Sequence, residues 1–370
     1  MQAEHLYVHV PFCARRCVYC DFSIAVRSRV PVDEYVEAID GELARRHASS
    51  DLNLRTLYLG GGTPSKLGPE GVRRLFDVLQ KHVDLAGDAE ITLEANPEDI
   101  TTEAVRSWRT AGVNRVSLGV QSFDDAVLTW MHRTHNSETA RNAVHELRDA
   151  GLTNISIDLI FAIPEFAGRS WARDLDSALS LELPHISAYG LTVEPHTPLG
   201  RWVARHDTEE APEEIFEHEF LAADQALCAA GFEHYEVSNY CRPGRYSQHN
   251  RAYWNRRPYA GVGPSAHEFD GVERRWNENA YAAWVARLHH EDPLAGRENL
   301  RSQHVIAEEV YLRLRTTAGL PLCAREIEHT RRWSDAGWAE LDAHSTLRLT
   351  PLGWLRLDSL ASDLTLLRSR

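Results

Sequence analysis

Short apolar runs alternate with longer amphipathic stretches over the first 230 residues, and this alternation constrains the fold most. The strand candidates are residues 6–10, 56–62, 90–96, 115–122, 155–164 and 185–194. Helix candidates between them include 32–48, 69–83 and 137–151, the last with Ser137 as predicted N-cap and Gly151 as predicted C′ residue. Strand–helix–strand repeats predict an α/β fold with a parallel sheet and helices outside it. Six units fit either a doubly wound sheet or an incomplete, TIM-like (β/α)6 barrel, and we favour the barrel.

The alternation of strand and helix candidates ends near residue 230. Residues 234–284 are aromatic and glycine-bearing at first, which predicts an irregular functional segment rather than a further βα unit. From 285 to 370 we expect a small helical, winged-helix-like domain in which TLRLTPLGWLRLD (346–358) forms a β-hairpin. The predicted organisation is therefore a core barrel over 1–233, an aromatic segment over 234–284 and a small domain over 285–370.

The composition and the pattern of apolar residues indicate where in the cell the protein works and which partners are excluded. No apolar run reaches the ~18 residues of a membrane helix, and the first residues lack the pattern of a signal peptide, so we expect a cytoplasmic protein with no transmembrane segment. The formal charge of −14 argues against a nucleic-acid partner.

Polar and glycine residues gather at the carboxyl ends of the predicted strands. Cys13 follows the first strand, the glycine run 60–62 the second, Glu94 the third and Gln121 the fourth, while Asp158 lies within the fifth. In barrels and open α/β sheets alike, this edge carries the functional site.

Three of the six cysteines, Cys13, Cys17 and Cys20, lie within eight positions in the pattern C-x3-C-x2-C. A disulfide would leave one of them over, and a tetrahedral zinc site would need a distant fourth ligand. A 4Fe-4S cluster held by three thiolates leaves one iron without a protein ligand, so that this iron can take an external one. We favour the cluster, with zinc as the alternative.

The cysteine pattern, with Tyr19 before its last cysteine and GGGT at 60–63 after a strand, resembles the radical S-adenosylmethionine (SAM) superfamily. The stretches YVHVPFCARRCVYCDF, GGGTPS, LEANPED, RVSLGVQSF, MHRTH and IDLIFAIP are similar to its oxygen-independent coproporphyrinogen III oxidase-like branch, which includes the heme-chaperone family HemW. This resemblance spans about residues 6 to 270. It implies a 4Fe-4S cluster on the three cysteines and SAM contacts at Tyr7, Tyr19, Gly61, Gly62, Thr63, Glu94, Gln121, Arg133, Asp158 and Gly190.

Two features separate the chaperones from the oxidases within that branch. Phe22 stands where the oxidases have a further cysteine, and HNRAYW at 249–254 matches the HNxxYW motif of HemW. The resemblance implies heme contacts at His249, Asn250, Tyr253 and Trp254, with His249 as the axial ligand of the heme iron and the aromatic rings stacked on the porphyrin. The sequence does not decide which residue is the second ligand of the heme iron; the candidates are His9, His132, His135, His234 and His267.

The leading hypothesis is therefore a heme chaperone that carries the cluster and SAM and transfers heme to an apo-hemoprotein, soluble or membrane-associated. No catalytic residue is assigned under this hypothesis, and a homodimer stays open. The alternative is a radical enzyme of the coproporphyrinogen III oxidase type, or one that modifies heme itself.

Overall fold

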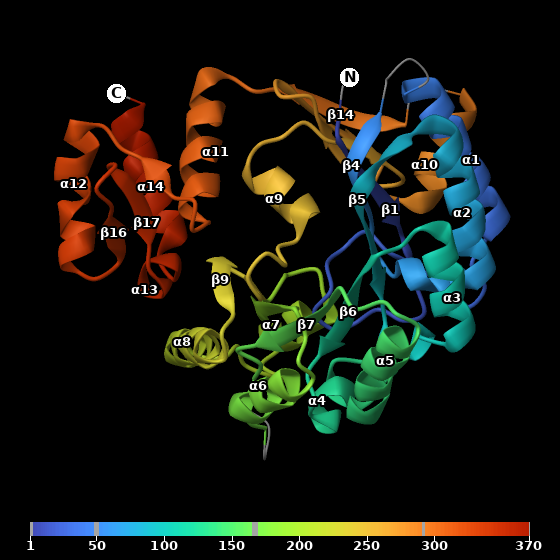
Figure 1. The fold of residues 1–370 in the computed structure, drawn as a ribbon, viewed down its shortest axis with the longest axis horizontal. Helices are drawn as coiled ribbons and strands as arrows, with labels where there is room; N and C mark the ends of the chain where they lie inside the picture. The colour runs from blue at the N-terminus through green and yellow to red at the C-terminus, as the bar shows by residue number, and fades with distance from the viewer. Residues whose placement is uncertain (1–2, 48–51, 165–168, 291–292, 370) are drawn as a thin grey trace.

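The computed structural model describes residues 3–47, 52–164, 169–290 and 293–369. A sheet in the order β11-β1-β4-β5-β6-β7-β8-β10-β9 forms its centre (Figure 1). Its six middle strands are parallel: β1 (His5–Val10), β4 (Asn53–Gly61), β5 (Asp84–Ala95), β6 (Arg115–Gln121), β7 (Ile155–Phe161) and β8 (His185–Gly190). These strands confirm the predicted incomplete (β/α)6 barrel, with bounds that differ by a few residues.

Helices follow the strands in turn and cover one face of the sheet (Figure 1). They are α1 (Val32–Arg46), α2 (Gly68–His82), α3 (Thr102–Ala111), α5 (Ser137–Asp149), α6 (Trp171–Ser180) and α8 (Glu213–Ala229). Apolar side chains at helical spacing, such as Val72, Leu75 and Leu79 of α2, are buried against the sheet. The alternation of strands and helices therefore produces the barrel through burial of these two complementary faces.

The predicted cap of α5 is wrong by one residue. Asn136, not Ser137, precedes the helix, and its side-chain oxygen accepts the backbone N–H of Thr139 at 2.8 Å. Asn and Ser cap helices about equally well, so the sequence does not separate two adjacent cap residues. At the other end Gly151 follows the C-cap Ala150 with φ +82°, as predicted for a C′ residue.

Residues 233–269 are not irregular, contrary to the prediction. They form β9 (Glu233–Glu236), β10 (Asn239–Cys241), α9 (Gln248–Trp254), β11 (Ala260–Val262) and β12 (His267–Phe269). Because β10 pairs with β8 and β11 pairs with β1, this segment joins the two outer edges of the parallel sheet. Helix α9 crosses the opening of the barrel between them (Figure 1).

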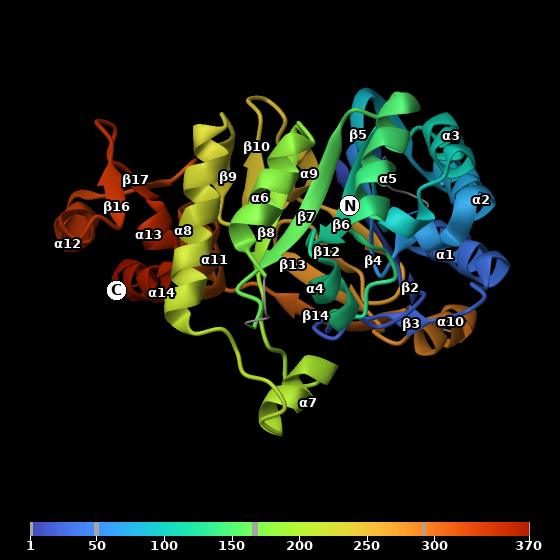
Figure 2. The same cartoon turned by 90° about the horizontal axis from the view of Figure 1, so that it is seen from below.

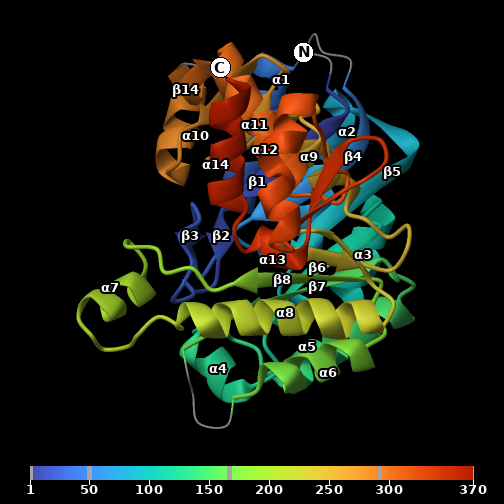
Figure 3. The same cartoon turned by 90° about the vertical axis from the view of Figure 1, so that its left-hand side faces the viewer.

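A second, three-stranded sheet follows in the order β12-β13-β14, with β13 (Glu273–Asn277) and β14 (Leu294–Asn299) on either side of α10 (Tyr281–His290). Two shorter helices, α4 (Asp125–Trp130) and α7 (Pro198–Ala204), lie in connections after β6 and β8. Figures 2 and 3 show α7 projecting from the body of the molecule. A short pair, β2 (Phe12–Cys13) and β3 (Ala25–Val26), encloses the cysteine segment.

The C-terminal module consists of α11 (Ser302–Leu314), β15 (Leu320–Pro321), α12 (Ala324–Asp335), β16 (Ala339–Leu341), β17 (Thr346–Leu349), α13 (Pro351–Trp354) and α14 (Leu357–Arg368). The hairpin predicted within 346–358 is wrong. Strand β17 pairs with β16 and β15, and Thr350 then caps α13, whose first residue is Pro351. Proline is favoured at the first position of a helix, which explains why the chain turns into a helix there. Within the described residues, no helix has both the length and the apolar character needed to span a bilayer.

Candidate functional site

A cavity of about 500 Å³ lies at the carboxyl edge of the parallel strands, where the sequence placed the site. We call it the cysteine cavity, because Cys13, Cys17 and Cys20 line it. It also brings together nine of the ten residues predicted to contact SAM: Tyr19, Gly61, Gly62, Thr63, Glu94, Gln121, Arg133, Asp158 and Gly190. The tenth, Tyr7, lies outside this lining and hydrogen-bonds to His9 at 3.2 Å between Oη and Nδ1.

The glycine run at the end of β4 allows close packing of the backbone. A Cβ atom on Gly62 would lie 2.7 Å from the carbonyl carbon and oxygen of Pro11, and one on Gly61 would lie 2.6 Å from the ring of His9. Gly61 also has φ +110°, in the region that favours glycine. Both glycines also line the cysteine cavity, so their predicted contact with a ligand stays a prediction.

Two half-buried carboxyl groups line the cysteine cavity, those of Glu94 and Asp158. Glu94 accepts hydrogen bonds from the Tyr58 hydroxyl at 2.7 Å and from the Gly61 N–H at 3.1 Å. Burial raises the pKa of Glu94 to about 7, and the nearby Asp158 adds to this rise. Burial also raises the pKa of Asp158, which accepts a hydrogen bond from the Ser117 hydroxyl at 3.3 Å. Both groups can therefore accept hydrogen bonds from a polar ligand, and Glu94 changes charge near neutral pH.

Arg133 connects the strand ends to the cysteine segment. Its Nη2 donates to Asn96 Oδ1 and to the carbonyl of Gly119, both at 2.7 Å, and its Nη1 donates to Cys17 Sγ at 3.4 Å. A guanidinium held against sulfur stabilises a thiolate, or a metal–thiolate group of negative charge.

The three thiols line one cavity. Among the described residues, no group of three His, Cys, Asp or Glu side chains is placed to hold a single metal ion. Burial raises the pKa of Cys13 to about 11, and its Sγ lies 3.3 Å from Thr63 Oγ1. Ligation of a metal displaces the thiol proton, so metal binding and deprotonation are coupled here.

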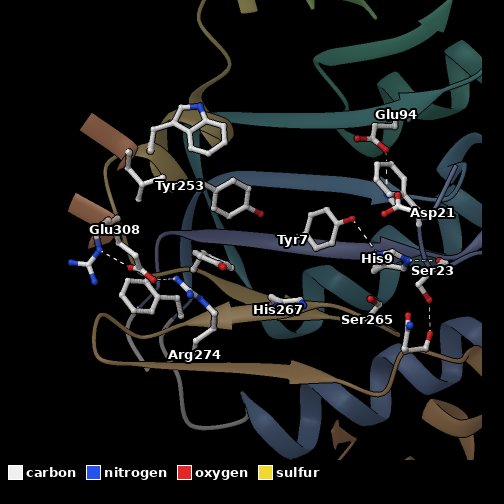
Figure 4. Close-up of a pocket in the computed structure, with 18 residues that line it drawn as sticks. Tyr7, His9, Asp21, Ser23, Glu94, Tyr253, Ser265, His267, Arg274 and Glu308 are labelled. Carbon is white, nitrogen blue, oxygen red and sulfur yellow. Dashed lines mark hydrogen bonds and ion pairs between the residues drawn. The ribbon is translucent and has the colours of Figure 1, made fainter. Parts of the chain in front are cut away.

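A second cavity, of about 630 Å³, lies beside the first (Figure 4). We call it the aromatic cavity, because Tyr7, Tyr253, Trp254, Tyr259 and Phe269 line it. Figure 4 shows Arg274 and Glu308 at one end, Glu94, His9 and Ser23 at the other, and Tyr7, Tyr253 and His267 between them. Asp21, Phe22, Gly61 and Glu94 line both cavities, so the two are adjacent. The walls of the aromatic cavity are formed largely by aromatic side chains, and charged side chains lie at its ends.

The predicted heme motif divides between this cavity and the protein interior. Tyr253 and Trp254 line the aromatic cavity, whereas His249 and Asn250 do not. His249 is 1% exposed. Its Nδ1 hydrogen-bonds with Thr56 Oγ1 at 2.6 Å, and its Nε2 with the Tyr253 hydroxyl at 2.8 Å. Neither ring nitrogen is available to iron in this conformation, so the assignment of His249 as iron ligand stays a prediction.

Helix α9 is anchored to the barrel through these contacts. The Glu90 carboxylate of β5 accepts the backbone N–H groups of Gln248 and His249 at 3.2 and 3.1 Å, in place of a side-chain cap from Ser247. Burial lowers the pKa of His249 to about 3, with His5 and Arg115 adding to the effect, so its ring is neutral. The histidine of the motif thus holds α9 in place, and its aromatic residues face the cavity.

Sequence reasoning missed several residues of both cavities. Asn96 and Ser117 line the cysteine cavity, and Arg256, Arg274 and Glu308 line the aromatic one. For Asn96 a signal was present, since it directly follows Glu94-Ala95 at a strand end. For Glu308 there was none, because it lies on α11 of the C-terminal module and reaches the cavity only in the folded chain.

Comparisons with known proteins agree with this geometry. Residues 7–177 match the family model "Radical SAM superfamily". The protein named "Heme chaperone HemW" of Mycobacterium tuberculosis (strain H37Rv) is 39% identical over 369 residues, which cover 97% of this chain and 94% of the relative. That of Escherichia coli (strain K12) is 38% identical over 264 residues, 71% of this chain and 69% of the relative.

Among solved structures, the coproporphyrinogen III oxidase HemN of Escherichia coli, a radical SAM enzyme, superimposes with a TM-score of 0.84. It is 22% identical and the match covers 98% of this chain and 89% of that one, which shows a shared fold. The sequence relatives and the family model show that the chain belongs to the HemW family of the radical SAM superfamily.

Proposed function

We propose that this protein is a heme chaperone, which binds heme in the aromatic cavity and transfers it to an apo-hemoprotein. The observation that carries the proposal is the position of this cavity: it is walled by the aromatic residues of the HNxxYW motif and adjoins the cysteine cavity. Flat, ring-lined walls with ionic groups at the ends suit a porphyrin, whose plane is apolar and whose propionates are anionic. The names of the relatives support the same assignment.

The cysteine cavity is proposed to hold a 4Fe-4S cluster on Cys13, Cys17 and Cys20. The donor set fits the cluster, because three thiols share one cavity and Arg133 places a positive charge against Cys17. A cluster held by three thiolates leaves one iron for an outside ligand. The remaining polar lining, above all Glu94, Gln121, Arg133 and Asp158, is proposed to bind SAM next to it. We further propose that the protein works in the cytoplasm, with heme and an acceptor protein as its partners.

One observation favours a second candidate, an enzyme that oxidises a porphyrinogen. The fold is that of a coproporphyrinogen III oxidase, and the aromatic cavity adjoins the proposed SAM site as a substrate site would. Phe22 weighs against it, because the resemblance to the oxidases leads us to expect a cysteine at this position. The Phe22 side chain is 63% exposed and lines both cavities. A phenyl ring there offers a contact surface to a porphyrin and no ligand or redox group.

The test uses full-length protein reconstituted anaerobically with iron and sulfide. We expect hemin to bind with about one equivalent per chain and then to pass to apomyoglobin, followed by the Soret band. Incubation with SAM, a reductant and coproporphyrinogen III separates the two candidates. No protoporphyrinogen together with stoichiometric heme binding and transfer supports the chaperone, and product formed at a catalytic rate, or failure to bind hemin, overturns it.

A further inference from the structure

Three side chains of a β-hairpin, formed by β12 and β13, line the aromatic cavity. In β12 and β13, His267 lies opposite Trp276 and Phe269 opposite Arg274. Residues directly opposite in antiparallel strands share a face, and alternate residues point to opposite faces. Glu268, between them, is buried on the other face, where it pairs with Arg46 at 2.7 Å and Arg275 at 3.0 Å. The register therefore places His267, Phe269 and Arg274 toward the cavity, which all three line.

His267 differs from the other histidines named above as candidate second ligands of the iron. His9 lines the same cavity, but its ring nitrogens bond to Tyr7 and to the carbonyl of Ser23. His135 and His234 are buried outside it, and His132 lines the cysteine cavity. His267 is exposed, and within the described residues its ring makes no hydrogen bond; it stacks on Trp276 at 6.0 Å between centroids and lies near the charge of Arg274.

One end of the cavity is arranged for an anion. The Glu308 carboxylate accepts from Arg256 Nε at 3.0 Å and pairs with Arg274 Nη2 at 2.8 Å, so two guanidinium groups share one carboxylate. Both guanidinium groups lie over the ring of Phe269, 5.3 and 5.6 Å from its centroid.

Two donors of residues that line the aromatic cavity also lack acceptors. Among the described residues, Trp254 Nε1 and Arg256 Nη2 are buried and have no hydrogen-bond partner. Buried donors are nearly always paired, and a carboxylate ligand supplies acceptors for them.

We infer that His267, rather than His249, is the protein ligand of the heme iron, and that Arg256 and Arg274 bind a heme propionate in exchange for Glu308. This inference rests on the proposed function and specifies the site within it. In a porphyrin the iron lies at the centre and the propionates lie at one edge. Figure 4 shows His267 in the middle of the cavity and Arg274 at one end. Tyr253, on the opposite side, then faces the macrocycle.

The exchange links heme to the C-terminal module. Glu308 belongs to α11, whereas Arg256 and Arg274 belong to the barrel side of the cavity. A propionate that takes over the two guanidinium groups releases Glu308 and breaks the two ion pairs that it makes with Arg256 and Arg274. Heme loading is thereby signalled to the module without a change at the cluster.

The test titrates full-length, cluster-reconstituted protein with hemin. The variants are His267→Gln, His267→Gly and, as a matched control, His344→Gln, an exposed histidine of the C-terminal module that lines neither cavity. We expect His267→Gln to lose the histidine-ligated absorption and EPR spectrum, His267→Gly to regain it with added imidazole, and His344→Gln to match wild type. Cluster absorption and circular dichroism report whether each variant is folded.

A second set of titrations tests the propionate assignment with heme dimethyl ester, which lacks the free carboxylates. Arg274→Gln is expected to weaken hemin binding about tenfold, the equivalent of one charged hydrogen bond, and to leave binding of the ester unchanged. Glu308→Gln is expected to strengthen hemin binding. Equal effects of Arg274→Gln on hemin and ester would overturn the propionate assignment.

The outcomes distinguish failure of the ligand assignment from failure of the proposed function. If wild type fails to bind hemin, the proposed function and the inference both fail. If wild type binds and His267→Gln keeps its spectrum and affinity, or if only His249→Gln loses them, the inference fails and the proposed function stands.

Discussion

Replacing His249 with alanine is expected to destabilise the protein strongly, because this side chain is a buried anchor. The change removes the hydrogen bond of the Tyr253 hydroxyl and one of the two hydrogen bonds of the Thr56 hydroxyl, which keeps its bond with His5 Nδ1 at 2.9 Å. It also opens a cavity at a residue that is 1% exposed. Each buried group that loses its partner costs about 1–3 kcal/mol, and truncation of a large buried side chain adds a cavity cost. Since neighbouring losses are not fully additive, we expect the free energy of unfolding to fall by about 3–5 kcal/mol.

The same residue makes stability depend on pH. In the unfolded chain a histidine has a pKa of about 6.5, whereas burial holds the pKa of His249 at about 3 in the folded protein. The unfolded state therefore binds the proton first as the pH falls, so the stabilising contribution is complete above pH ~6.5 and declines below it. At ~1.36 kcal/mol per pH unit, His249 accounts for a loss of about 2 kcal/mol between pH 7 and pH 5.

Urea denaturation followed by tryptophan fluorescence measures both effects, at pH 7 and at pH 5. His344→Ala is the control, an exposed site where we expect a change within about 0.5 kcal/mol. The alanine variant at 249 should also lose about 2 kcal/mol less than wild type on acidification, and the other buried histidines cancel in this difference. A loss below about 1 kcal/mol at pH 7, or an unchanged pH dependence, would refute the anchoring role. A confirmed loss means that weakened heme binding in this variant does not by itself identify an iron ligand.

Further predictions concern the cysteine cavity. Serine in place of Cys13, Cys17 or Cys20 should abolish the visible absorption of the reconstituted cluster while Cys323→Ser, at an exposed cysteine, keeps it; persistence of the band in all three would exclude the cluster assignment. Gly62→Ala places a Cβ 2.7 Å from the Pro11 carbonyl group and should lower the free energy of unfolding by about 1–3 kcal/mol, against a negligible effect of Gly87→Ala, where no atom lies within 4 Å. Because the pKa of Glu94 is raised to about 7, its carboxylate forms as the pH rises through 7. Calorimetric titration should then show tighter binding of the cationic SAM at pH 8 than at pH 6, and Glu94→Gln should remove this difference.

The alternation of apolar strands and amphipathic helices was enough to predict the barrel, because burial of two complementary faces is a local property of the sequence. The cysteine cavity was predictable for the same reason. Polar residues at the ends of parallel strands meet at one edge, so Cys13, Gly61, Glu94, Gln121 and Asp158 converge there from five separate segments.

The existence and lining of the aromatic cavity became clear only from the tertiary structure. Its parts come from α9, β12, β13 and α11, whose approach depends on the pairing of β10 and β11 with opposite edges of the sheet. Such non-local pairings leave no periodic signal, so the segment seemed irregular in the sequence. The motif HNRAYW pointed to His249 for the same reason. The sequence shows which residues are present, whereas burial determines that His249 bonds inward to Thr56 and that His267 faces the cavity.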